Sequence, residues 1–109
     1  MITITVKKRN GNYLEFVSKG HAGYAEEGQD IVCAAVSALV INLVNSIERL
    51  TSDRMCFVSD EKEGKIEFRF LDVPSHDAQL LLDSMILGIE EIEDSDEYHS
   101  YIDIIFKEV

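Results

Sequence analysis

The stretch "DIVCAAVSALVINLVNSIERL", residues 30–50, places an apolar residue at almost every angle of a helix. A helix that is apolar around most of its circumference belongs inside a protein core, where other elements cover several of its faces. At 1.5 Å per residue it would be about 30 Å long, and Arg49 complements the negative end of its dipole. We therefore expect a central helix around which the remainder of the chain packs.

A β-hairpin is predicted before this helix. Residues 2–7 alternate apolar and polar side chains, which is the period of a half-buried strand. The pair Asn10-Gly11 follows, and it favours a tight turn because both residues tolerate positive φ. A returning strand is expected over 12–18. Its predicted faces are Leu14 and Phe16 on one side, and Tyr13, Glu15 and Val17 on the other.

The second half of the chain repeats this order. Strands are predicted over 55–60 and 65–72, followed by an amphipathic helix that opens at Pro74 with Ser75 as its N-cap. A last strand is expected over 98–109. The resulting ββαββαβ order predicts an α+β domain, in which a mostly antiparallel sheet packs with two helices.

The length and charge limit the possible functions. A chain of 109 residues fits a single domain, 1–109. The net charge of −11 argues against direct binding of nucleic acid, which depends on Lys and Arg neutralising phosphates. It favours a basic partner instead, although an acidic surface also serves solubility alone.

The N-terminal sequence, the longest apolar stretch and the cysteines bear on the cellular compartment of the protein. The opening "MITITVKKRN" lacks the apolar core of a signal peptide, and "IVCAAVSALVINLV" is interrupted by Ser37 and Asn42 and falls short of a membrane span. We expect a cytoplasmic protein with no membrane segment, so Cys33 and Cys56 should be reduced thiols. The histidines show no paired metal-ligand spacing, which predicts no metal site. Cys56 is expected in the core.

Cys33 is the candidate nucleophile. If the helix begins near Asp30, Cys33 falls in its first turn, where unpaired N–H groups and the helix dipole favour a thiolate. His21 is the histidine closest to Cys33 in sequence, and the two would form the nucleophile and base of an acyl-transfer enzyme. The intervening loop contains Gly23 and Gly28, and it has the composition of a lid as well as that of an ordinary surface loop.

Each of these residues also has a structural interpretation. Cys33 alone could be a small buried hydrophobic residue. Asp30 could cap the helix or hold the His21 imidazole in its useful tautomer; we favour capping, but the sequence leaves both open. Ser37, one turn after Cys33, could donate to the sulfur or bond back to a carbonyl one turn earlier.

The string "GHAGYAEEGQDIVCAAVSAL", residues 20–39, resembles the signature of the ribosomal-processing cysteine proteases called Prp. Their pattern is Gly-His-Ala, a glycine-containing loop, and Asp-Ile-Val-Cys-Ala-Ala-Val-Ser. Its positions are all met here, by Gly20, His21 and Ala22 and then by 30–37. The length and the ββαββαβ order are similar to those of the family as well.

The resemblance implies a specific activity. Prp-like proteins are homodimers that remove the N-terminal extension of a bacterial large-subunit ribosomal protein, after a Phe-rich segment. Carried onto this chain, Cys33 is the nucleophile, His21 is the general base, and the loop 22–29, with Ala22, Gly23 and Gly28, closes over the peptide. No cofactor is implied.

Two other functions remain open from the sequence. One is a non-enzymatic acidic module that binds a ribosomal protein or a ribosome assembly intermediate, which would not need the His–Cys pair. The other is a different thioester-forming hydrolase or transferase, which would use the same pair on another acyl substrate.

Overall fold

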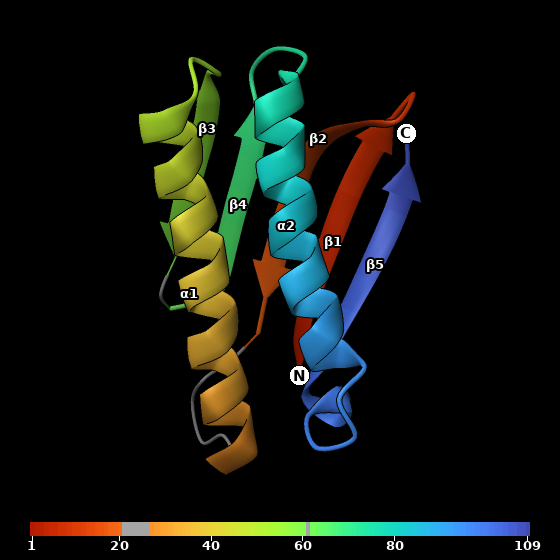
Figure 1. The fold of residues 1–109 in the computed structure, drawn as a ribbon. Coiled ribbons are helices and arrows are strands. Elements are labelled where there is room, and N and C mark those ends of the chain that lie inside the picture. Colours follow the sequence, from red (N-terminus) through yellow and green to blue (C-terminus); the bar gives the residue numbers. More distant parts are fainter. Residues whose placement is uncertain (21–26, 61) are drawn as a thin grey trace.

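The computed structural model describes residues 1–20, 27–60 and 62–109, with 27–30 described by their backbone alone. It has the predicted ββαββαβ order and confirms the α+β class (Figure 1). The elements are β1 (Ile2–Arg9), β2 (Asn12–Lys19), α1 (Glu27–Leu50), β3 (Met55–Asp60), β4 (Lys65–Phe70), α2 (His76–Glu93), the short 3₁₀ helix η1 (His99–Tyr101) and β5 (Ile102–Glu108).

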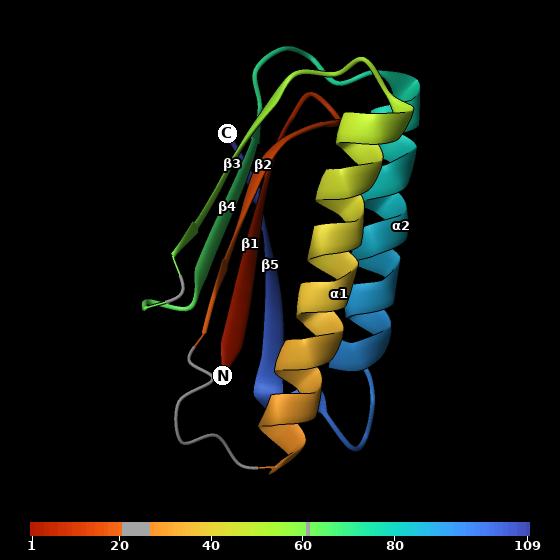
Figure 2. The same ribbon diagram turned by 90° about the vertical axis from the view of Figure 1, so that its left-hand side faces the viewer.

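The strands form one sheet in the order β3-β4-β2-β1-β5. Both hairpins and the β2–β4 pair are antiparallel, as predicted, whereas β5 pairs with β1 in parallel. Both helices pack on the same face of the sheet, and within the described residues no layer covers the other face (Figure 2). The helix layer and the sheet therefore meet along one interface, and β3 and β5 form the two edges of the sheet.

The core fills this interface. Phe16 and Phe68 stack with their ring centroids 5.1 Å apart, and Phe68 meets Phe70 edge to face at 4.9 Å. Both arrangements are favourable for aromatic rings. The fully buried residues packed around them include Ile4, Val6, Val32, Val40, Ile47, Leu82 and Ile89.

The first hairpin confirms one prediction and corrects another. Asn10 and Gly11 have φ values of 52° and 81°, as the predicted turn requires. A β-bulge, however, shifts the register between Lys7 and Lys8. A bulge adds one residue and moves the following side chain to the other face. Tyr13 therefore shares the buried face with Phe16 and is only 6% exposed, so the predicted assignment of Tyr13 to the opposite face is wrong.

The central helix is less enclosed than its composition predicts. Its inward side packs on the sheet and on α2, but Ile31 and Ile41 are 52% and 48% exposed, and Ala34 and Ala38 are also exposed. The expectation that several faces of this helix are covered is therefore wrong for this chain alone. By length and composition, Ile31–Leu50 also passes as a membrane span, with a mean hydropathy of 1.9.

In the C-terminal half, the structure corrects the predicted start of the last strand. Ser75 is the N-cap of α2, because its hydroxyl accepts from the N–H of Ala78 at 3.1 Å, as predicted. The last strand begins at Ile102 rather than at residue 98. His99 is held in a turn, since its N–H donates to the carbonyl of Ser95 at 2.9 Å. These local bonds compete with strand pairing, which explains the shorter strand.

Candidate active site

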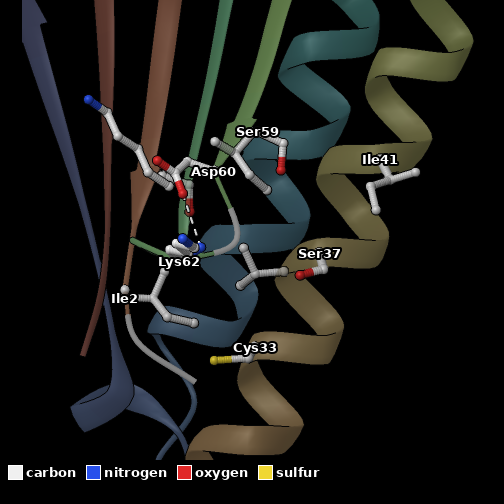
Figure 3. Close-up of a pocket in the computed structure, with 13 residues that line it drawn as sticks. Ile2, Cys33, Ser37, Ile41, Ser59, Asp60 and Lys62 are labelled. Carbon is white, nitrogen blue, oxygen red and sulfur yellow. Dashed lines mark hydrogen bonds between the residues drawn. The ribbon is translucent and has the colours of Figure 1, made fainter. Parts of the chain in front are cut away.

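A cavity of about 530 Å³ lies between α1 and the sheet and contains Cys33 (Figure 3). Its walls come from the beginning of β1, the end of β2, the first half of α1 and the hairpin between β3 and β4. The lining includes apolar Ile2, Val36, Ile41 and Ile66, hydroxyl-bearing Ser18, Ser37 and Ser59, and charged Asp60, Lys62 and Lys65. A cleft lined by both apolar and polar side chains, with a thiol on its wall, is suited to holding a peptide.

Cys33 is half-buried on α1, and its sulfur points from the helix toward the sheet (Figure 3). It packs against the core on one side and lines the cavity on the other. Cys33 and Cys56, both in the described part of the chain, do not form a disulfide with each other. The Cys33 thiol is thus accessible from the cavity rather than enclosed in the core.

The start of α1 overturns the argument that placed Cys33 at a helix terminus. The helix begins at Glu27, so Cys33 is its seventh residue and lies in the second turn. The unpaired N–H groups belong to the first four residues, and the effect of the dipole fades within the first turn. The prediction that first-turn amides activate the sulfur is therefore wrong, and groups that face Cys33 across the cavity become more important.

The same boundary changes the interpretation of Asp30 and Gly28. Asp30 is the fourth residue of α1 and does not occupy the N-cap position, so the capping prediction is wrong. Gly28, expected in the loop, is the second residue of the helix. His21, Ala22 and Gly23 lie outside the described residues, and the contact between His21 and Cys33 stays a prediction.

Ser37 is brought to the site as the spacing predicts. It lies one helical turn after Cys33, and both line the cavity. Cys56 is not in the core. It pairs with Arg69 on β4, while its neighbour Phe57 pairs with the buried Phe68 on the helix side. Side chains alternate along a strand, so Cys56 lies on the uncovered face of the sheet.

Sequence reasoning missed the cations of the cavity. Lys62 and Lys65 lie in and after the turn between β3 and β4, more than 25 residues beyond Cys33, and only the fold brings them to α1. Lys65 bonds to Glu67 at 3.0 Å, and this hydrogen bond keeps the pKa of Lys65 above its ordinary value. Ile66, which lies between these two residues on β4, packs against the core, so the ion pair of Lys65 and Glu67 lies on the other face of the sheet. Lys62 is then the cation, among the described residues that line the cavity, whose charge is not paired in this way.

Gly20 fixes the chain at the point where it leaves the sheet. Its N–H donates to the carbonyl of Gly64 at 3.1 Å, which ties the end of β2 to the second hairpin. A Cβ at position 20 would lie 2.8 Å from the Cα of Ile2, and real Cβ atoms essentially never come that close to the backbone. Only glycine fits here, directly before His21 in the sequence.

Replacing Gly20 with alanine should therefore lower the free energy of unfolding by about 1–3 kcal/mol, the usual cost of overpacking. Urea unfolding measures the change. Gly88→Ala is the matched control, because the Cβ there meets only the flexible end of Leu39, at 3.1 Å, and alanine favours a helix. Equal stability of the two variants would contradict the account of Gly20.

The comparison with known proteins agrees with this geometry. A family model described as cysteine protease Prp matches residues 1–103. The ribosomal processing cysteine protease Prp of Staphylococcus aureus is 35% identical over 108 residues, which cover 98% of this chain and 100% of the relative.

Solved structures are similar over the same length. The crystal structure of an essential ribosomal processing protease Prp from S. aureus in complex with a substrate peptide superposes with a TM-score of 0.90 at 34% identity, covering 98% of this chain and 100% of that one. A second S. aureus structure, with a covalently linked product peptide, has a TM-score of 0.86 at 35% identity and the same coverage.

Proposed function

The chain belongs to the family of the cysteine protease Prp, and from this premise we propose that it removes the N-terminal extension of a bacterial large-subunit ribosomal protein, with Cys33 as nucleophile. The observation that carries the proposal is the place of Cys33 in the wall of a peptide-sized cavity. As a member of this family the chain is a cysteine protease, which decides against the non-enzymatic docking module.

The proposed reaction has two steps. The Cys33 thiolate attacks the carbonyl carbon of the scissile peptide bond, and the C–N bond breaks as His21 gives its proton to the leaving amine. Water, deprotonated by the same imidazole, then hydrolyses the thioester and releases the carboxylate of the extension. A covalently linked product peptide on the S. aureus relative supports a covalent route for this family.

His21 is well placed along the chain to act as this base. It follows Gly20, which lines the cavity and is anchored to Gly64. We assign Asp30 and Ser37 supporting roles: Asp30 orients the imidazole, and Ser37 donates to the sulfur. The segment with Ala22 and Gly23 is proposed to close over the bound peptide, without Gly28, which belongs to α1.

The substrate is proposed to be a precursor with a Phe-rich extension. The apolar side chains Ile2, Val36 and Ile66 in the cavity suit such a peptide. The net charge of −11 would attract a basic ribosomal protein and hasten its association at low salt. We also propose that the enzyme is cytoplasmic, because a ribosomal substrate would be made there, and that it is a homodimer without a cofactor, as the resemblance to Prp implies.

Incubation with a synthetic peptide tests the proposal. A peptide with a Phe-rich segment followed by alanine should give two fragments by mass spectrometry, separated at the bond after the last Phe. A peptide of the same composition in scrambled order is the control. If the Phe-rich peptide stays intact under conditions in which the cavity thiol is reduced and reactive, the proposed function is wrong.

A further inference from the structure

The cavity continues as a groove that leads away from Cys33 along α1. Cys33, Ser37 and Ile41 are four residues apart and line the same cavity, so they form a stripe on one side of the helix. Figure 3 shows these three side chains following α1, with Ser59 and Asp60 of β3 across from them. One wall of the groove is this stripe, and the opposite wall is the edge strand β3.

The backbone of β3 has hydrogen-bonding groups that the sheet does not use. The N–H of Leu71 donates to the carbonyl of Arg54 at 3.0 Å, so Arg54 and Leu71 are a hydrogen-bonded pair of the antiparallel ladder. Such pairs alternate along an antiparallel ladder, so Cys56, Val58 and Asp60 bond to β4. The N–H and C=O groups of Phe57 and Ser59 are consequently directed outward from the sheet.

The side chains of β3 on this wall are suited to an apolar ligand. Phe57 and Ser59 pair with Phe68 and Ile66 on the helix side of the sheet. Phe57 is 37% exposed and Ile41 is 48% exposed. Ile41 thus gives the helix wall of the groove apolar surface. On the opposite wall, Phe57 lies on the same face of β3 as Ser59 and continues it beyond the residues that line the cavity, and the strand carries backbone groups that the sheet does not use.

We infer that the groove is the acyl-side subsite of the protease, in which the substrate lies extended along the edge of β3 with an apolar side chain on Ile41. This inference rests on the proposed function. Eight residues of helix separate Ile41 from Cys33, about 12 Å along the axis. An extended peptide advances about 3.3 Å per residue, so Ile41 meets the residue three or four positions before the scissile bond.

Strand addition explains how the enzyme recognises a flexible peptide. Main-chain bonds to an exposed strand edge give affinity, and the pockets for alternate side chains give selectivity. β3 runs toward the cavity, since Ser59 and Asp60 at its end line it. A peptide with its acyl side in the groove and its scissile bond at Cys33 would therefore run parallel to β3.

The experiment combines Ile41→Asn with a set of substrate peptides. Each peptide carries alanine at one of the five positions before the scissile bond, and kcat/KM is measured for every pair of enzyme and peptide. We expect Ile41→Asn to lower kcat/KM by about 10-fold or more on the parent peptide, as the loss of one apolar contact does. The loss should shrink toward 1-fold only when the peptide carries alanine three or four positions before the bond.

Matched controls separate this result from general effects. Leu87→Asn makes the same kind of change on α2 at a residue 61% exposed, and it should leave every peptide unaffected. N-methylation of the peptide backbone should reduce cleavage at alternate positions, because only every second amide faces β3.

Several results would contradict the assignment of the groove as the acyl-side subsite. One is an equal effect of Ile41→Asn and Leu87→Asn on kcat/KM. Another is a loss on Ile41→Asn that is the same whichever peptide position carries alanine. A third is an effect of N-methylation that does not alternate along the peptide. The same peptides are also titrated against Cys33→Ala, so the coupling is measured by binding even if no peptide is cut. Absence of cleavage by the unaltered enzyme would count against the proposed function, whereas cleavage without coupling would count only against the groove.

Discussion

Cys33→Ala is expected to lower kcat/KM for the Phe-rich peptide by about 10⁴-fold or more, because loss of a catalytic nucleophile removes the covalent route altogether. The sulfur lies in the cavity wall and is only half-buried, so the variant should fold. Its circular dichroism spectrum should match that of the parent, and its unfolding midpoint should stay close to it. Initial rates from fragment yields measure the activity.

Cys56→Ala is the matched control for this experiment. Cys56 lies on β3, opposite Arg69 and away from the cavity, so its removal should leave kcat/KM within about 2-fold of the parent, since it contributes nothing to transition-state binding. A folded Cys33→Ala variant that still cuts the peptide at the parental rate would contradict the assignment of the nucleophile.

The second large effect is expected for His21→Gln. Removing a general base lowers the rate by about 10²–10⁴-fold. The thiolate would then have to form without an imidazole partner, so the remaining activity should rise with pH toward the ordinary thiol pKa of about 8.5. The measurement is kcat/KM as a function of pH for the variant and the parent. Glutamine retains a polar side chain of similar length, but its amide does not take up or release a proton in this pH range as the imidazole does.

His76→Gln is the control, because the His76 side chain is 89% exposed at the start of α2 and is not among the described residues that line the cavity. It should keep both the parental rate and the parental pH profile. If His21→Gln behaves like His76→Gln, His21 is not the base. A loss of activity with an unchanged pH profile would instead assign His21 a role in positioning the substrate.

Local patterns in the sequence predicted the elements of the fold correctly. Asn10-Gly11 forms the predicted turn because its conformation depends on these two residues alone. Ser75 caps α2 for a similar reason, since the bond to Ala78 spans three residues. The apolar period of 30–50 predicted a long core helix, and α1 occupies that stretch.

Features that depend on register or on distant contacts were not predicted. The bulge at Leu14, opposite Lys7 and Lys8, moved Tyr13 to the core face, where its hydroxyl donates to Asp83. Nothing within the hairpin sequence shows that partner, because it lies 70 residues away. The helix start at Glu27 was missed because Asp30 is itself a good N-cap residue, and this error moved Cys33 out of the first turn.

The site was predicted in part. Cys33 and Ser37 were found from their spacing, which one helix preserves. Lys62, Lys65 and Ser59 were not, because the cavity forms only when the second hairpin packs beside α1. The turn that carries Lys62 resembles any polar turn in the sequence, so charge patterning alone gives no signal for its role.

Trapping the acyl-enzyme tests the central claim most directly. The enzyme is mixed with the Phe-rich peptide, quenched in acid within milliseconds to seconds, and analysed by intact mass and by digestion. We predict an added mass equal to the extension fragment, joined to the peptide that contains Cys33 and absent from Cys33→Ala. An adduct on Cys56, or complete cleavage with no adduct at any quench time, would contradict attack by Cys33.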